Sequence, residues 1–260
     1  MKRLISAFGF LTILPLPTVE WERGDLGRSA GLFPFVGLVL GAVLYAIYLA
    51  AQTVLPASVC AVLIVAAWAW LTGGLHLDGV TDCGDGFFAA VSRERRLEIM
   101  RDPRMGAFGG ITLVLFLLLK VSALAEAHGQ PRDLSAEWIG PVFPLLFAPA
   151  VARFTLLLIA KQPSARPGGM ADEFAQQLGT GAFVLGALIP LGLALLDPLP
   201  LRAGIAVGMA LLTTGLVVVI ARSKLGGVTG DVLGLSVELS ELAVLLVYCS
   251  TRFSSNVLVH

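Results

Sequence analysis

Long apolar runs separated by short polar segments dominate the chain. Seven of these runs are long enough to cross a bilayer as helices, which takes about 20 residues each. They lie at 31–54, 57–77, 106–127, 138–160, 180–196, 201–221 and 232–250. A further apolar stretch from Leu4 to Leu16 is shorter and is interrupted by Pro15 and Pro17, which favours a short interfacial or re-entrant helix. The pattern predicts an all-α polytopic membrane bundle, with residues 1–260 forming one domain.

The composition agrees with a membrane protein. Hydrophobic residues make up 57% of the chain, charged residues 14%, and the mean hydropathy is +0.86, whereas soluble domains have about 45–50% apolar and about 25% charged residues. Lys+Arg and Asp+Glu number 18 each, so the chain lacks the basic excess expected of a nucleic-acid-binding protein. We therefore expect the lipid bilayer as a partner and no nucleic acid.

The basic residues predict an orientation, because Lys and Arg concentrate in cytoplasmic loops. One set of alternate loops holds eleven of them: Arg23, Arg28, Arg93, Arg95, Arg96, Arg101, Arg104, Lys161, Arg166, Arg222 and Lys224. The opposite set holds three: Arg132, Arg202 and Arg252. This predicts a multi-pass protein of the cytoplasmic (inner) membrane whose polar loops, 18–30, 78–105, 161–179 and 222–231, face the cytoplasm. Residues 256–260 are then expected outside.

The largest group of acidic residues follows the second predicted span. Asp78, Asp82 and Asp85 are spaced by four and three residues, so on a helix they share one face. Three like charges repel unless a cation lies among them, and Mg²⁺ is the usual cation for a few carboxylates with a substrate phosphate. We interpret the three as metal ligands. The glycines at 79, 84 and 86 are expected to let a bulky ligand approach the backbone.

Other polar residues of the same segment are candidates for substrate chemistry. Arg95, Arg101 and Arg104 can bind phosphate oxygens, since a guanidinium matches them bidentately. The alternative is that these arginines only set topology and anchor lipid headgroups. His76 is either an acid–base group or a polar residue at a helix end.

The last span carries carboxylates that need partners. Asp231 and Glu238 are seven residues apart on one stripe, with Glu241 close to it, and carboxylates inside a span usually face a polar interior. Arg153, in the fourth span, is expected to pair with them, either around a substrate or as a buried structural ion pair. We expect Lys120 to extend toward the outer membrane surface.

These motifs resemble those of the cobalamin synthase family, also called adenosylcobinamide-GDP ribazoletransferases. The resemblance is carried by the run Thr72-Gly73-Gly74-Leu75-His76-Leu77-Asp78-Gly79, by Asp82, Asp85-Gly86, Leu97-Glu98-Ile99-Met100-Arg101-Asp102 and Gly106, and by Gly226-Gly227 with Thr229-Gly230-Asp231, Leu233-Gly234 and Glu238-Leu239. Matches at Phe10-Leu11-Thr12, Leu14-Pro15-Leu16-Pro17, Phe33-Pro34 and Val36-Gly37 extend it along the chain.

The resemblance implies the last lower-ligand assembly step of coenzyme B12. Such an enzyme joins adenosylcobinamide-GDP to α-ribazole, or to its 5′-phosphate, and releases GMP in a Mg²⁺-dependent phosphotransfer. Asp78, Asp82 and Asp85 would then hold Mg²⁺ on the diphosphate, and Asp85 or His76 would accept the hydroxyl proton, with Arg101 at the reacting phosphate. Arg95, Arg104, Arg153, Asp231 and Glu238 would bind substrate. Association with other cobalamin-assembly enzymes, or self-association, is a further expectation.

Two other classes share part of this pattern. A CDP-alcohol phosphatidyltransferase also uses membrane-end aspartates, and Asp82-Cys83-Gly84-Asp85-Gly86 matches the start of its motif, but the Ala-Arg and the later aspartates of that motif are missing. A small-solute transporter would account for charges within spans, yet the chain shows no internal repeat of the kind that transporters have. Both are less consistent with the sequence than the ribazoletransferase.

Overall fold

The structure is a computed structural model that describes residues 1–17, 20, 22, 24–129, 142–166 and 168–250. Within these residues, every regular element is helical, which confirms the predicted all-α class. The elements are α1 (Lys2–Leu11), α2 (Asp25–Ser29), the 3-10 helix η1 (Ala30–Leu32), α3 (Phe33–Ala51), α4 (Ala57–Leu71), α5 (Leu75–Phe88), α6 (Arg93–Ile99), α7 (Ala107–Gly129), α8 (Val142–Ala160), α9 (Met170–Gln176), α10 (Thr180–Leu196), α11 (Pro200–Leu225) and α12 (Gly230–Cys249).

Among the described residues, five helical stretches are long and apolar enough to cross a membrane, and a sixth arises if α4 and α5 form one bent span. The five are α3 with its extension back to Asp25, and α7, α8, α11 and α12. Helix α10 has only 17 residues, about 26 Å at 1.5 Å per residue, slightly less than the ~30 Å hydrocarbon core. The polytopic bundle is confirmed; the described part of the chain holds five or six full-length candidate spans and the shorter apolar helix α10, where about seven spans are predicted from the sequence. The predicted start of the fourth span and the expected position of residues 256–260 lie outside the described residues, and the single domain stays a prediction.

The second predicted span, 57–77, is interrupted by a sharp bend. Helix α4 ends at Leu71, and α5 leaves it at 94°. Gly73 and Gly74 make the turn with φ of 63° and 69°, a left-handed conformation that favours glycine. The segment 78–105, predicted as a loop, is therefore largely helical. The aspartates of α5 do lie on a helix, as their spacing predicts.

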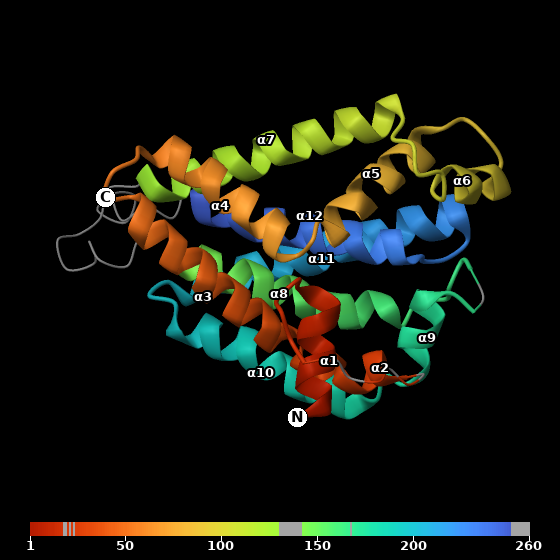
Figure 1. The fold of residues 1–260 in the computed structure, drawn as a ribbon, viewed down its shortest axis with the longest axis horizontal. Helices are drawn as coiled ribbons and strands as arrows, with labels where there is room; N and C mark the ends of the chain where they lie inside the picture. Colours follow the sequence, from red (N-terminus) through yellow and green to blue (C-terminus); the bar gives the residue numbers. More distant parts are fainter. Residues whose placement is uncertain (18–19, 21, 23, 130–141, 167, 251–260) are drawn as a thin grey trace.

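Helix α12 is the most enclosed span and lies in the middle of the bundle (Figure 1). It packs against α5, α7, α8 and α11. By contrast, α7 and α11 expose rows of large apolar side chains, including Leu115, Leu118, Leu212 and Leu216. Such outward apolar faces suit contact with lipid, so α12 forms the protein interior and these two helices its periphery.

The glycines of α5 serve helix packing, which corrects the prediction that they admit a bulky ligand. A Cβ at Gly79 would clash with the backbone oxygen of Asp231, and one at Gly84 would lie 2.8 Å from the Thr112 hydroxyl. At Gly86 the added Cβ would lie 2.6 Å from Met100. Neighbouring segments thus fill the space beside each glycine and hold α5 close against α12 and α7.

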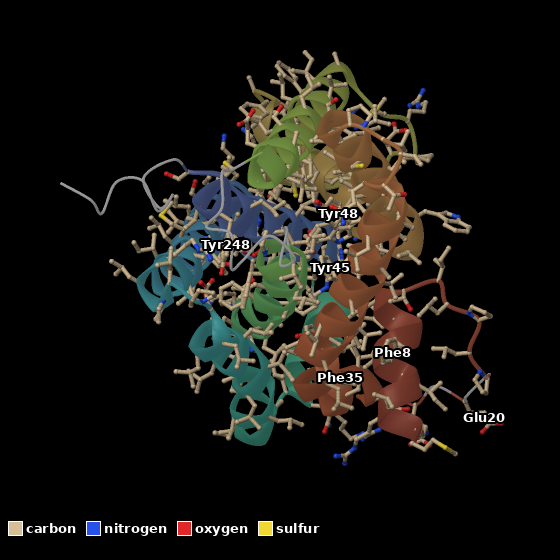
Figure 2. The ribbon with its side chains drawn as sticks, turned by 90° about the vertical axis from the view of Figure 1, so that its left-hand side faces the viewer. Phe8, Glu20, Phe35, Tyr45, Tyr48 and Tyr248 are labelled. Atoms are coloured by element: carbon tan, nitrogen blue, oxygen red, sulfur yellow. The ribbon has the colours of Figure 1, made fainter. Side chains whose placement is uncertain are left out.

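The predicted short N-terminal helix is confirmed as α1, which lies beside α3 (Figures 1 and 2). Figure 2 shows Phe8 next to Phe35 of α3, and their ring centroids are 6.3 Å apart. After α1 the chain passes the bend between α4 and α5. There the Ile13 amide donates a hydrogen bond to the Leu71 carbonyl at 2.9 Å. Helix α1 thereby brings its aromatic residues toward the start of α5.

Three connections meet at one end of the bundle, on the right in Figure 1. The Lys224 ammonium, from the end of α11, donates to the Phe87 carbonyl of α5 at 2.8 Å. The Ala165 amide, before α9, donates to the Val228 carbonyl before α12, also at 2.8 Å. The segments that carry most of the predicted site residues therefore converge.

Candidate active site

Three carboxylates form the acid cluster, which we define as Asp78, Asp82 and Asp231. Asp78 and Asp82 are one turn apart on α5, and Asp231 begins α12 where its backbone touches Gly79. Asp82 lies close enough to feel the negative charges of both other members. Asp78 is exposed, whereas Asp82 and Asp231 are half-buried. The cluster therefore joins two of the acidic segments that the sequence singled out.

Arg166 is the cation that the structure places at this cluster. Its Nη1 lies 3.2 Å from Asp231 Oδ2, and its Nη2 donates to the Leu97 carbonyl of α6 at 3.0 Å. The Thr229 hydroxyl also donates to Asp231 Oδ2 at 3.2 Å. Asp231 is thus fixed between the α8–α9 connection and the start of α12. Sequence reasoning counted Arg166 only as a topology residue.

Asp85, predicted as a metal ligand and candidate base, contacts the start of α7. Its Oδ2 accepts a hydrogen bond from the Gly106 amide at 2.7 Å and its Oδ1 from the Gly109 amide at 2.8 Å. Such amides at a helix start have no partner within their own helix, so a carboxylate there acts as a cap. Both Asp85 oxygens are engaged in holding α7 against α5. Its predicted metal and catalytic roles stay predictions.

The acid cluster suits Mg²⁺ only as a partial ligand set. Among the described residues, no group of three or more His, Cys, Asp or Glu side chains is arranged to hold a metal ion. Mg²⁺ is commonly bound by one or two carboxylates, with substrate phosphates and water completing its coordination. Asp78 and Asp82, adjacent on one helix face and without an ion-pair partner among the described residues, fit that mode. A closed protein cage is not needed.

A cavity of about 110 Å³ opens beside the acid cluster. Its polar lining includes Asp78, Asp231 and His76. Apolar side chains from α1, α5, α8, α9 and α12 also line it: Phe10, Leu75, Leu156, Phe174 and Leu233. His76 is buried, and its Nδ1 has no hydrogen-bond partner among the described residues. The Nδ1 atom is therefore an unpartnered polar group enclosed by protein beside the cavity.

Two of the predicted phosphate-binding arginines form ion pairs outside the acid cluster. Arg95 pairs with Glu98 at 2.7 Å, and Arg104 pairs with Asp102 at 2.7 Å. The Arg104 guanidinium holds the pKa of Asp102 at about 2, because it donates hydrogen bonds to the carboxylate. Arg101 is exposed on the same connection. No ion pair joins these arginines to the cluster within the described part of the chain, so their substrate role stays a prediction.

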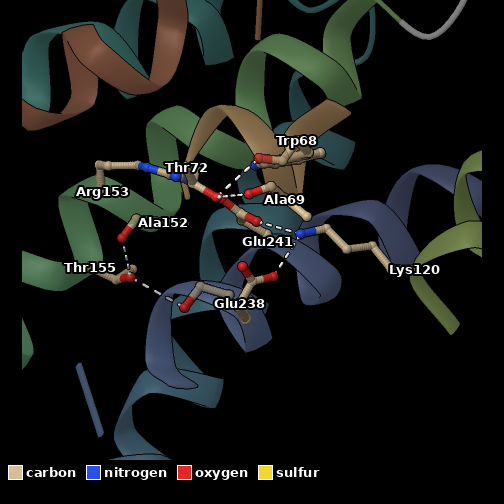
Figure 3. A network of polar contacts seen from close by, with 10 residues as sticks. Trp68, Ala69, Thr72, Lys120, Ala152, Arg153, Thr155, Glu238 and Glu241 are labelled. Atoms are coloured by element: carbon tan, nitrogen blue, oxygen red, sulfur yellow. Dashed lines mark hydrogen bonds and ion pairs between the residues drawn. The ribbon is translucent and has the colours of Figure 1, made fainter. Parts of the chain in front are cut away.

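A second set of charged residues, the interior ion network, is buried among α7, α8 and α12 (Figure 3). The Lys120 ammonium lies 2.7 Å from Glu238 Oε2 and 2.7 Å from Glu241 Oε2. It also lies 4.1 Å from the centroid of the Trp68 ring. Arg153 Nη1 pairs with Glu241 Oε1. Two cations and two carboxylates thus balance one another away from water.

This network corrects one prediction from the sequence and confirms another. Lys120 does not extend toward the membrane surface but points inward, and Arg153 forms a buried ion pair with one of the carboxylates of the last span, Glu241. A charge balance would have identified Lys120: two glutamates in one span need two cations, and Arg153 supplies only one. Arg153 Nε and Nη2 have no partner among the described residues. The predicted substrate contacts of Glu238 and Arg153 stay predictions. In the structure, Glu238 pairs with Lys120 and Arg153 pairs with Glu241.

Comparison with known proteins places the chain in context. A family model described as cobalamin-5-phosphate synthase matches residues 3–249. A relative in Pseudomonas aeruginosa, named adenosylcobinamide-GDP ribazoletransferase, is 40% identical, with 95% of this chain and 97% of the relative covered. Relatives with the same name are 38% identical in Brucella anthropi, covering 93% and 94%, and 37% identical in Klebsiella pneumoniae, covering 95% and 98%. No solved structure matches significantly.

Proposed function

The chain belongs to the cobalamin-5-phosphate synthase family, and we propose that it acts as an adenosylcobinamide-GDP ribazoletransferase at the cytoplasmic face of the inner membrane. It joins adenosylcobinamide-GDP to α-ribazole, or to its 5′-phosphate, and releases GMP. The observation that carries the proposal is the acid cluster, in which Asp78, Asp82 and Asp231 meet at the end of the bundle that holds most of the basic connections. A transporter is less consistent with the structure, because the charges within the spans pair with one another.

The reaction is a phosphoryl transfer that forms one bond to phosphorus and breaks another. A ribose hydroxyl of α-ribazole forms a bond to the phosphorus nearer the corrinoid, the bond from that phosphorus to GMP breaks, and the hydroxyl proton passes to a base. Asp78 and Asp82 would hold Mg²⁺, which neutralises charge on the diphosphate when bound. Arg166 adds positive charge beside Asp231 and keeps that carboxylate in place.

Two side chains are candidates for the base. Both oxygens of Asp85 accept hydrogen bonds from the start of α7, whereas His76 Nδ1 has no hydrogen-bond partner among the described residues but is enclosed by protein. A base must lie within hydrogen-bond reach of the proton that it removes. We therefore keep His76 and Asp85 as alternative proton acceptors, and Asp85 in addition caps α7.

The test is product formation by the purified protein in nanodiscs. With adenosylcobinamide-GDP, α-ribazole and Mg²⁺, we expect GMP and the joined corrinoid in equal amounts. Asp82→Asn should lower the turnover at least 100-fold, whereas Glu94→Gln, at an exposed carboxylate on α6, should leave it unchanged. GMP release that persists in Asp82→Asn at limiting Mg²⁺ would contradict the assignment of the cluster. Product formation from lipid alcohols in place of α-ribazole would instead indicate a phosphatidyltransferase.

A further inference from the structure

The cavity beside the acid cluster has a chemically mixed lining. Phe10, Leu156 and Phe174 contribute apolar side chains to it, and Asp78 and Asp231 contribute carboxylates. Carboxylates suit hydroxyl groups or a metal-bound phosphate, and a wall of aromatic and leucine side chains suits a flat apolar ring. One molecule that presents both chemistries is a riboside whose base is an apolar aromatic ring system.

We propose that the cavity lined by Phe10 and Phe174 binds the aromatic base of the acceptor riboside, so that its ribose lies beside Asp78 and Asp231. This inference rests on the proposed function, from which the acceptor α-ribazole is taken; its base is a dimethylbenzimidazole. It assigns the acceptor, and not the nucleotide or the corrinoid, to this cavity. It also makes Phe10 and Phe174 residues that determine specificity.

The size of the cavity favours a single ring system. Its volume of about 110 Å³ is of the order of the ~150 Å³ apolar cavity that accepts benzene. A corrinoid or a guanosine diphosphate is several times larger and would have to remain outside. The benzene edge of the base can enter the cavity, and the attached ribose then stays at its mouth with the carboxylates.

The two phenylalanines are held in place before any ligand arrives. Phe33 of α3 lies between them, with ring centroids 5.8 Å from Phe10 and 5.6 Å from Phe174. Phe174 is 0% exposed, and Phe10 is half-buried on α1. A rigid aromatic pocket loses little conformational freedom on binding. Helices α1 and α9, distant in sequence, thus both contribute to the lining of one cavity.

The apolar wall also predicts which bases are rejected. Leu156, Leu233 and the phenylalanines offer no hydrogen bond to the extra ring nitrogens and the amino group of a purine. A buried polar group left without a partner is unfavourable, so adenosine should be a much poorer acceptor than a benzimidazole riboside. Selectivity against purines would then arise from burial and not from a clash.

The experiment measures KM for each substrate separately, using GMP release by the full chain in nanodiscs. In Phe174→Leu and Phe10→Leu we expect KM for α-ribazole to rise about tenfold, the size of one lost aromatic contact, while KM for adenosylcobinamide-GDP and kcat change less than twofold. The matched control is Phe8→Leu, since Phe8 lies on the same helix against Phe35 and does not line the cavity. It should leave both KM values unchanged.

Unchanged KM for α-ribazole, or parallel changes in both KM values, would overturn the inference. If the wild-type protein releases no GMP, the proposed function fails, and equilibrium dialysis of α-ribazole against the same variants tests the cavity directly. If α-ribazole binds to the wild type, and binds more weakly to Phe174→Leu but not to Phe8→Leu, the result would still support binding of the base in this cavity. Equal binding to all three proteins, or to none, would refute it.

Discussion

Replacing Lys120 by methionine tests whether the interior ion network stabilises the bundle. Lys120 contacts Glu238 and Glu241, each at 2.7 Å, and lies over Trp68 at 4.1 Å. The substitution keeps the length of the side chain and removes its charge. Glu241 retains Arg153 as a partner, but Glu238 loses its only ion-pair partner among the described residues. The substitution therefore leaves one buried carboxylate, that of Glu238, without an opposite charge.

The expected cost follows from that single unpaired charge. Removing one partner of a buried ion pair costs about 3–5 kcal/mol, and we expect the lower end, about 3 kcal/mol, because Arg153 still balances Glu241. Since about 1.4 kcal/mol corresponds to a factor of ten, the unfolding equilibrium should shift by about 150-fold. Adding Glu238→Gln to Lys120→Met should recover part of this loss, so the two substitutions should not be additive.

The assay is reversible unfolding in detergent micelles, followed by far-ultraviolet circular dichroism. Lys161→Met is the matched control, because Lys161 is exposed after α8 and the same chemical change there should alter the free energy of unfolding by less than about 0.5 kcal/mol. If Lys120→Met destabilises by less than about 1 kcal/mol, or adds to Glu238→Gln, the network does not hold these helices together.

Three further outcomes are expected. Asp85→Asn should retain turnover and lose only part of the capping, because its single amide oxygen can accept from one of the two glycine amides, while Asp85→Ala should lose about 1 kcal/mol of unfolding free energy; an inactive Asp85→Asn that is at least as stable as Asp85→Ala would restore the predicted catalytic or metal role. Gly79→Ala should destabilise by about 1–3 kcal/mol, since its Cβ meets the Asp231 backbone, whereas Gly215→Ala, with open space around it, should be neutral or stabilising; equal unfolding midpoints would contradict the close packing of α5 and α12. In a background without Cys60, Cys83 and Cys249, Ser92→Cys should react with a membrane-impermeant thiol reagent only after cells are opened, and labelling of intact cells would reverse the topology.

The sequence by itself determined the class of protein and most element positions. Apolar runs of about 20 residues predict spans because each backbone polar group in lipid must bond within its own helix. The spacing of Asp78, Asp82 and Asp85 predicts one helix face for the same local reason. Where prediction erred, at the break before α5, the cause is the paired glycines 73 and 74, whose left-handed turn ends an otherwise apolar run.

Only the tertiary structure decided which charges meet. Asp231 and Glu238 share a stripe of α12, yet seven residues span about 10.5 Å, so Asp231 joins the acid cluster while Glu238 joins Lys120. Arg166 reaches Asp231 from a distant connection, and Asp85 turns to the start of α7. Periodicity fixes the face of a helix but not its partner, and in a low-dielectric interior each charge is stable only beside the opposite charge that packing brings to it.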